Sequence, residues 1–469
     1  MKKVLLFSLV ATLLVSCGSM GTGDLVGVQN RPFFSPVEPF GMVFCKSGSY
    51  QMGPNDQDVT WAMTAEQKTV SVSPFWIDQT EITNNEYRQF VNWVRDSIAY
   101  KILGAEVDEE TYLITQNSFE EDIDPPFVNW YAKLQYNSDD EDVRNALKQM
   151  YLPENERFYR RKEIDTRKLL FEYYWIDLRQ AAKKSNFDGK IRTAYNWETK
   201  KYDGQVTDFS KGETYGERVD IKDRSSYIMR DVINVYPDTL VWISDFTYSF
   251  NEPQAKAYFW HPGYDNYPVV GVTWKQARAF SIWRTELKNS YLREGGEPTV
   301  QDYRLPTESE WEYAARGGLK SSMYPWGGYY ITNHRGCYIA NFKPLRGNYP
   351  ADGGFYPLIV AHYAPNEFGV YDMAGNVAEW TRNAWNPAAY SYTDDLNADY
   401  EYECLPNDPP EKKRKVVRGG SWKDVAMYLQ CGTRTYEYQD TAKSYIGFRC
   451  VREFIGHDFN DPGTGSELY

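Results

Sequence analysis

The residues best suited to binding a metal ion lie in the stretch Asp372–Trp380, which reads DMAGNVAEW. The carboxylate of Asp372 opens this stretch, and that of Glu379 nearly closes it. Gly375 and Asn376 lie between the two acids and permit a tight turn. Two acids that flank a sharp turn direct side-chain and backbone oxygens at one point, and a hard cation such as calcium prefers oxygen ligands. The alternative is an ordinary turn that leads into a strand.

Other catalytic patterns are weak. Five cysteines follow the N-terminal leader, and their odd number leaves at least one thiol unpaired: Cys45, Cys337, Cys404, Cys431 and Cys450. Their spacing matches no CxxC or other zinc pattern. The four histidines are scattered, and none lies in a nucleophile motif. The sequence also has no P-loop and no Gly-rich dinucleotide turn.

The N-terminus predicts a lipoprotein. Lys2 and Lys3 precede an apolar run over 4–15, which is too short to span a membrane comfortably. Leu-Val-Ser before Cys17 is typical of a lipobox, so we expect a signal peptide over 1–16, acylation of Cys17 and a tether over 17–40. No acidic retention signal follows Cys17, which favours the outer membrane with the protein facing the periplasm. Simple secretion is the alternative.

Composition narrows the class of partner. The net charge of −13 argues against nucleic acid, because such a partner requires a basic surface. The basic run 412–415 is interpreted as a solvated loop before a strand at Val416 and Val417. Aromatic residues make up 16% of the chain, which suits a loop-rich fold and broad protein interfaces.

Three helices are predicted from capping boxes, in which Ser or Thr precedes Glu or Gln by three residues. The pairs are Thr83 with Glu86, Thr273 with Gln276, and Thr307 with Glu310. Apolar residues recur behind each pair with helical spacing, and the third helix is predicted to stop at Gly317-Gly318. Alternation on either side of Ser47-Gly48 predicts two short strands.

Residues 100–256 form a charged, Tyr-rich block that is too long for a structureless loop. Within it, Asp165 or Thr166 is predicted to cap a helix that runs to Lys184, with Leu170, Tyr174, Leu178 and Ala181 on one face. We interpret the block as an ordered insertion whose exposed aromatic residues bind a partner. A self-contained decoration on the core is the alternative. Residues 456–469 are expected to form a flexible tail.

Seven motifs resemble the formylglycine-generating enzyme (sulfatase-modifying factor) family, and they occur in that family's order. They are MVFCKSGSYQMG, FWIDQTEITNNEY, YPVVGVTWKQA, RLPTESEWEYAARGG, MAGNVAEW, RGGSW and IGFRC. The resemblance implies an α+β fold, with a C-type-lectin-like arrangement poor in regular secondary structure. The family domain would comprise residues 41–99 and 257–455.

The resemblance also argues against catalysis. The family's oxidase requires two reactive cysteines just after its GGS segment, where they hold copper and bind the substrate thiol. Asp424 occupies the first of these positions, and no Cys lies between Ser421 and Cys431. We therefore expect no copper and no formylglycine synthesis. The resemblance also matches Cys431 and Cys450 to cysteines that form structural disulfides in the enzyme. The position of the partner cysteine is matched to Ala315 for Cys431 and to Ser281 for Cys450, so both bridges are expected to be missing.

The family's structural calcium positions are retained in part. By motif matching, a first site would use the side chains of Asp372 and Glu379 with the carbonyls of Gly375 and Val377. A second would use Asn341, the carbonyl of Phe342, Asp352 and the backbone near Gly354. The resemblance thus implies that calcium cross-links loops with few ladder hydrogen bonds.

The lipobox, the insertion and the overall length also resemble the GldK/PorK lipoproteins of type IX secretion and gliding motility. That resemblance implies a ring under the outer membrane, with homo-oligomeric contacts and a periplasmic partner of the GldN/PorN type. Ring contacts of the head-to-tail kind join two different faces of one domain. A related gliding lipoprotein of the GldJ type shares the fold and is the nearest alternative within this resemblance. Two alternative functions also stay open: a formylglycine-type oxidase and a lectin-like periplasmic binding protein.

Overall fold

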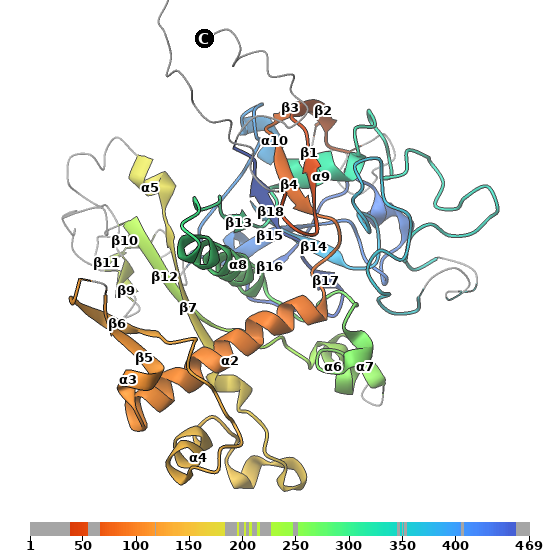
Figure 1. Cartoon of the computed structure of the whole chain (residues 1–469). Helices are drawn as coiled ribbons and strands as arrows, with labels where there is room; N and C mark the ends of the chain where they lie inside the picture. The colour runs from red at the N-terminus through yellow and green to blue at the C-terminus, as the bar shows by residue number, and fades with distance from the viewer. Residues whose placement is uncertain are drawn as a thin grey trace, which may run out of the picture. The chain divides into compact units, whose positions relative to one another are not determined.

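Three capped helices organise the chain (Figure 1). They are α2 (Asn84–Glu106), α8 (Trp274–Glu294) and α9 (Glu308–Arg316). A capping box begins each helix, at Thr83, Thr273 and Thr307. The threonine side chain accepts a hydrogen bond from the backbone N–H of the Glu or Gln three residues later. The side chain of that Glu or Gln accepts a hydrogen bond from the backbone N–H of the threonine. Helix α9 ends at Gly317, whose φ of 57° is left-handed. All three predicted helix starts, and the predicted end of the third helix, are confirmed.

The computed structural model describes residues 38–54, 66–117, 119–182, 227–246, 252–344, 354–404 and 408–455, with residues 348 and 350 and short strand segments between 195 and 215. Residues Pro39–Phe454 form one compact unit. The predicted lipid attachment site Cys17 and the predicted tail 456–469 lie outside the described residues. No described helix is long and apolar enough to cross a membrane.

Two four-stranded sheets form the centre of this unit. The first has the antiparallel order β1 (Met42–Cys45), β4 (Phe75–Asp78), β18 (Val451–Glu453), β13 (Tyr303–Arg304). The second has the order β16 (Thr435–Tyr438), β15 (Arg414–Arg418), β14 (Ala378–Ala384), β17 (Ile446–Gly447), in which β14 and β17 are parallel. The two strands predicted around Ser47 are confirmed, but each pairs elsewhere: β1 with β4, and β2 (Gly48–Met52) with β3 (Lys68–Val72).

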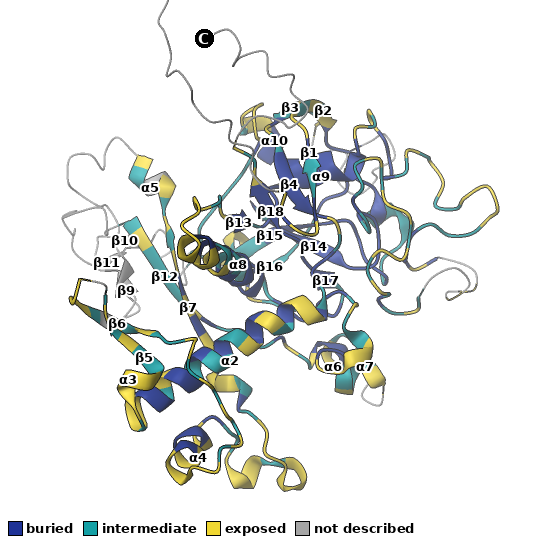
Figure 2. Cartoon of the chain, viewed as in Figure 1, coloured by how far each residue is buried: buried dark blue, intermediate teal, exposed yellow. Residues whose placement is uncertain are grey.

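An aromatic core joins the helices to the sheets. Tyr87 and Phe90 of α2 lie against Phe280 and Trp283 of α8, and the rings of Tyr87 and Phe280 stack with centroids 5.6 Å apart. Phe448, just before β18, closes this cluster from the sheet side. One face of α2 is buried and the other exposed, as its amphipathic pattern predicts (Figure 2).

The insertion is ordered in its described parts and shares this core. Helix α2 continues into it, and buried residues of β7 (Leu170–Ile176) and β12 (Ile228–Asn234) join the same cluster. The other elements are α3 (Glu109–Tyr112), β5 (Leu113–Gln116), β6 (Asp122–Val128), α4 (Glu141–Lys148), α5 (Leu178–Ala182), α6 (Val241–Asp245), α7 (Pro253–Ala257) and the two-stranded β8 (Tyr195–Asn196), β9 (Lys201–Tyr202), β10 (Val206–Asp208) and β11 (Glu213–Tyr215).

The helix predicted to start at Asp165 or Thr166 and end at Lys184 is wrong. A short 3-10 turn at Thr166–Lys168 leads instead into strand β7. Phe171 and Tyr173 are buried while the residues between and beside them are exposed, so the strand has a period of two. Branched and aromatic side chains favour this pleated surface, and pairing with β12 outweighs the weaker helical pattern.

Candidate functional site

The Glu379 carboxylate is buried at the start of β14 and lies against the guanidinium of Arg449. Both guanidinium Nε–H and Nη2–H of Arg449 donate to it, at 2.6 to 2.9 Å. Trp311 of α9 donates its indole N–H to Glu379 Oε2 at 2.7 Å. Through these contacts Glu379 joins the stretch Asp372–Trp380 to helix α9 and to the segment before β18. A carboxylate has about four lone-pair sites, and these four hydrogen bonds occupy them.

Two further acids lie near this pair. Glu81 is fully buried, and its Oε2 accepts from Asn376 Nδ2 at 2.7 Å while its Oε1 accepts from the Val377 N–H. Burial raises the pKa of Glu81 well above its ordinary value, and the negative charges of Asp372 and Glu379 add to this. Burial likewise raises the pKa of the Asp372 carboxyl to about 6. Three acids thus share one guanidinium, so this cluster favours an additional proton or cation.

The turn itself needs its glycine. Gly375 has a φ of 82°, and a Cβ there would lie 2.3 Å from the Asn341 carbonyl oxygen. Asp372 also has a positive φ, of 55°, and its Oδ2 accepts the Ala361 N–H at 2.6 Å. The Asn376 N–H donates to the Asn341 carbonyl, so the turn and the neighbouring loop are held together directly.

The second predicted calcium site offers one unused oxygen. Asn341 is 1% exposed, and its Nδ2 donates to the Tyr356 carbonyl at 3.0 Å. Its Oδ1 is buried and accepts no hydrogen bond from the described residues. A buried amide oxygen without a donor is costly, and a cation would satisfy it. Phe342 and Gly354 lie on the same loop region, whereas Asp352 falls outside the described residues.

These observations fit the two predicted calcium sites unequally. At the first, the Glu379 oxygens are saturated by Arg449 and Trp311, so the residues do not fit coordination by Glu379. At the second, Asn341 Oδ1 fits a calcium ligand. No group of three or more His, Cys, Asp or Glu side chains is arranged to hold a metal within the described ranges. Calcium therefore stays a prediction.

Asp424, which the resemblance matches to the first cysteine of the oxidase, lies in a short turn after the GGS segment. Ser421 is fully buried, and its hydroxyl donates to Asp424 Oδ2 at 2.6 Å. The Asp424 carbonyl accepts the Lys343 N–H, which ties the segment to the loop of Asn341. Burial raises the pKa of the Asp424 carboxyl. The Asp424 carboxyl group therefore fixes its own turn through Ser421, and its backbone carbonyl joins that turn to the neighbouring loop.

The thiols are poor nucleophiles. The structure records no disulfide among Cys45, Cys337, Cys404, Cys431 and Cys450. Burial raises the pKa of Cys45, Cys404, Cys431 and Cys450 to about 12, so these four are protonated at neutral pH. A reactive cysteine needs a lowered pKa and access to solvent. Cys337 is half-buried in a loop.

A second buried ionic cluster lies beside the GGS segment. Arg418 donates to the Glu312 carboxylate and to the carbonyl of Cys431, and Arg434 donates to both oxygens of Glu308. Burial alone would raise the pKa of Glu308, but the charges of Arg434 and Arg418 outweigh it and hold the pKa below its usual range. Arg316 also pairs with Glu312, and all five charged groups are at most 2% exposed, so each buried charge has an oppositely charged partner.

The structure also identifies residues that the sequence did not point to. Glu81, Trp311 and Arg449 complete the environment of Glu379, yet they lie far from it in sequence. Each of the three residues lies in one of the seven family motifs. Membership of these motifs was the feature of the sequence that could have identified them.

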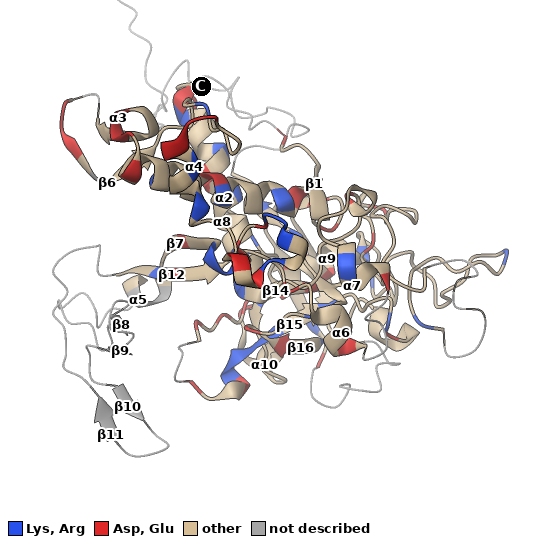
Figure 3. Cartoon of the chain, turned by 90° about the horizontal axis from the view of Figure 1, so that it is seen from below, with Lys and Arg blue, Asp and Glu red and all other residues tan. Residues whose placement is uncertain are grey.

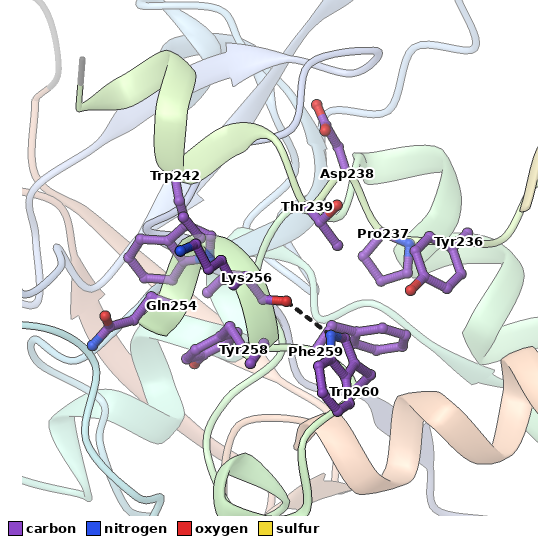
Figure 4. A pocket seen from close by; sticks show the side chains of 13 residues that line it. Tyr236, Pro237, Asp238, Thr239, Trp242, Gln254, Lys256, Tyr258, Phe259 and Trp260 are labelled. Carbon is purple, nitrogen blue, oxygen red and sulfur yellow. Dashed lines mark hydrogen bonds between the residues drawn. The ribbon is translucent and has the colours of Figure 1, made fainter. Parts of the chain in front are cut away.

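Two cavities open between described elements. The smaller, of about 170 Å³, lies at α6 and α7 and is lined by aromatic rings that include Trp242, Tyr258 and Trp260 (Figure 4). Trp260 donates its indole N–H to the Lys256 carbonyl at 2.8 Å, so this polar group is already paired. The larger, of about 480 Å³, lies beside β15 and β16.

Residues 30–454 match the sulfatase-modifying factor enzyme 1-like domain. The chain belongs to this family. The predicted family fold is thereby confirmed. Both the enzyme and the proteins named inactive are found among its relatives, so family membership alone leaves catalysis open.

The inactive C-alpha-formylglycine-generating enzyme 2 of Bos taurus is 32% identical over 192 residues, which are 39% of this chain and 50% of that protein. The formylglycine-generating enzyme of Mus musculus is 31% identical over 198 residues, which are 40% of this chain and 45% of the enzyme. The match thus spans about half the length of these relatives. The structure of PvdO from Pseudomonas aeruginosa aligns over 88% of this chain and 94% of its own, at 16% identity and a TM-score of 0.43.

Proposed function

We propose that this member of the sulfatase-modifying factor family is a non-catalytic scaffold protein that assembles through its insertion. The observation that carries the proposal is an apolar sheet face, defined as the outward side chains of β7 and β12: Leu170, Tyr174, Ile176, Ile228 and Val232. These side chains are between 45% and 59% exposed. Exposed apolar patches of this kind are typical of protein interfaces.

The register of the two strands brings these side chains together. Ile176 lies opposite Ile228, and Tyr174 opposite Arg230. Arg230 Nε lies 2.7 Å from a carboxylate oxygen of Glu172 on the same face. Because these two opposite charges pair with each other, they add no net charge to the apolar sheet face. The opposite face of β7 is buried, since Phe171 and Tyr173 pack in the core. The apolar sheet face is thus held rigidly by the domain, as an assembly contact requires.

The region that corresponds by resemblance to the oxidase active site supports a structural role. Asp424 replaces the first oxidase cysteine and is fixed by Ser421, and Cys431 is buried with its pKa raised to about 12. Copper-dependent thiol oxidation requires accessible thiolates. The buried ion pairs around Glu379 and Arg418 instead hold loops together.

The finer assignment rests on the N-terminal sequence and the resemblance to GldK/PorK lipoproteins. We propose that Cys17 carries acyl chains that fix the protein to the outer membrane, facing the periplasm. There it forms a ring of the type IX secretion and gliding machinery with a partner of the GldN/PorN type. Head-to-tail contacts between two different faces close into rings when the rotation permits.

The test is mild detergent extraction from native membranes, followed by sizing and mass spectrometry of the proteins that travel with the chain. We expect a megadalton assembly with a periplasmic partner. The double variant Tyr174→Ser/Ile228→Ser should shift the chain to smaller species. Leu287→Ser is the matched control, because Leu287 is 47% exposed on α8, outside the insertion. An assembly that survives the double variant, or a lone monomer of the natural chain, contradicts the proposal.

A second measurement tests the absence of catalysis. A sulfatase peptide with its substrate cysteine is incubated with the purified protein, copper and a thiol reductant, and aldehyde formation is followed by mass spectrometry. We expect no aldehyde. An aldehyde product would establish an oxidase and would overturn the non-catalytic proposal.

A further inference from the structure

The larger cavity is an aromatic groove beside the basic run of the sequence. It is defined by Ala384, Trp385, Asn386, Pro387, Tyr400, Tyr402, Glu411, Lys412, Arg414 and Tyr436, and its volume is about 480 Å³. Lys412 and Arg414 of the basic run 412–415 line it, at the point where the chain enters β15. Figure 3 shows the Lys and Arg residues of the chain in blue, including those at β15. The run was expected to be a plain solvated loop. The structure corrects this expectation, because Arg414 and Lys415 belong to strand β15 and Lys415 is buried.

Two cations of this run, Lys412 and Arg414, line the groove together with one acid, Glu411. Lys412 Nζ lies 5.0 Å from the centre of the Tyr402 ring and donates to its hydroxyl at 3.3 Å. The Arg414 guanidinium lies 4.6 Å from the centre of the Tyr436 ring. Neither Lys412 nor Arg414 forms an ion pair with an acidic side chain of the described residues. The only acid in the lining is Glu411, which is exposed at the rim.

The Arg414 guanidinium has donors to spare. Its Nη2–H donates to the Tyr438 hydroxyl at a long 3.4 Å. Its Nε–H is buried and donates to no group of the part of the chain that the structure describes. Because this Nε–H is buried, a ligand in the groove would be bound through the terminal Nη–H groups, and a carboxylate accepts two parallel hydrogen bonds from such a pair. A neutral ligand is expected to bind here more weakly than a carboxylate, because it would leave the positive charge of the guanidinium without a counter-charge.

The other walls are aromatic and fixed. The rings of Trp385 and Tyr436 lie 5.0 Å apart, and the Tyr402 hydroxyl donates to Asp408 at 2.9 Å. Tyr436 lies on β16, which is paired to β15 on one side. Rigid rings at a groove bind flat or branched apolar side chains at low entropic cost. The groove therefore combines one anion site with an apolar platform.

We propose that this groove binds an acidic segment of a partner protein, in which a Glu or Asp carboxylate lies next to an aromatic or aliphatic side chain. The carboxylate would pair with Arg414 and Lys412, and the apolar side chain would pack on Trp385 and Tyr436. Charge complementarity carries the choice, because the described lining holds two cations, Lys412 and Arg414, against one acid, Glu411, on a chain whose net charge is −13. The groove lies outside the apolar sheet face, so this inference does not depend on the scaffold proposal.

The test uses fluorescence anisotropy with the purified full-length protein and a labelled peptide, Gly-Glu-Trp-Glu-Leu-Glu-Gly. We expect saturable binding that weakens as salt is raised. Arg414→Gln should weaken binding about tenfold, and Arg414→Lys, which keeps the charge and loses the fork, by an intermediate factor. Lys320→Gln is the control, because Lys320 is an exposed lysine outside the groove. Melting curves of each variant verify that it is folded.

Two peptide controls separate charge from aromatic packing. A peptide with Lys in place of Glu should not bind, and one with Ser in place of Trp and Leu should bind several-fold more weakly. Equal binding by the Lys peptide, or binding unchanged in folded Arg414→Gln, overturns the proposal. Tighter binding of a neutral oligosaccharide such as cellohexaose, insensitive to salt, also overturns it and favours a carbohydrate site.

Discussion

The hydroxyl of Ser281 lies 3.4 Å from the thiol of Cys450. Ser281 is on helix α8, and Cys450 directly precedes strand β18, so this contact fastens the helix to the first sheet. Both residues are at most 1% exposed. The resemblance to the family enzyme matches these two positions to the two cysteines of a structural disulfide, and the structure places their side chains in contact. A hydroxyl–thiol contact thus occupies a location where a covalent bond would fit.

We expect Ser281→Cys to form a disulfide with Cys450 under oxidising conditions. The bond would close a long loop, and cross-links of this kind contribute about 2–4 kcal/mol to the free energy of unfolding. The measurements are thiol titration of the denatured protein and melting curves with and without reductant. Ser281→Ala is the control and should gain nothing from oxidation. Two free thiols at these positions after oxidation would contradict the expectation.

Removing the Glu379 carboxylate should destabilise the fold strongly. Glu379→Gln removes the only carboxylate among the described residues that is hydrogen-bonded to the buried Arg449 guanidinium, and leaves Glu81 and Asp372 as more remote counter-charges. Breaking a buried pair of this kind costs about 3–5 kcal/mol in the free energy of unfolding. Denaturant titration of the variant measures this loss. The control is Glu453→Gln, whose ion pair with Arg304 has a side chain 58% exposed and contributes less than about 1 kcal/mol. Equal losses for the two variants would refute the buried-pair argument.

Local signals predicted the helices well because capping is a local interaction. The Thr307 and Glu310 pair, for example, bonds within a single turn. The site was predicted less completely, since Glu379 is saturated by Arg449, 70 residues away. Strand β7 was misread as a helix because its buried partners, on β12 and α8, lie beyond the window in which periodicity is judged. Tertiary pairing decided both outcomes.

Calcium is expected to stabilise the protein through the loop of Asn341. If calcium satisfies the buried Asn341 Oδ1, adding it at about 100 times its dissociation constant raises the free energy of unfolding by about 2.7 kcal/mol. Melting curves after EDTA treatment, with calcium or magnesium added back, measure this shift. Asn341→Ala should abolish it, whereas Asn341→Asp keeps an oxygen ligand and should retain it. No shift, with no calcium in elemental analysis, would eliminate the prediction.

Lys415 is a buried cation that the fold tolerates at a cost. It is 1% exposed on β15, where its Nζ donates to the Tyr402 carbonyl at 3.0 Å and lies 3.9 Å from the centre of the Trp274 ring. Burial lowers the pKa of Lys415 from 10.5 to about 8. The charged groups that face it are Glu403, Arg278, Glu401 and the Cys404 thiol. The positive charge of Arg278 acts in the same direction as burial.

The pH dependence follows from this lowered pKa. Between about pH 8 and 10.5 the unfolded chain holds a proton on Lys415 that the folded chain has released, so this residue makes stability rise with pH there. Below pH 8 both states are protonated, and the buried charge costs stability. Lys415→Met should therefore stabilise the protein by about 1–2 kcal/mol at pH 7, with a gain that shrinks towards pH 10. Denaturant titrations at both pH values measure it, with exposed Lys320→Met as the control. A gain that is independent of pH would show that Lys415 acts through packing alone.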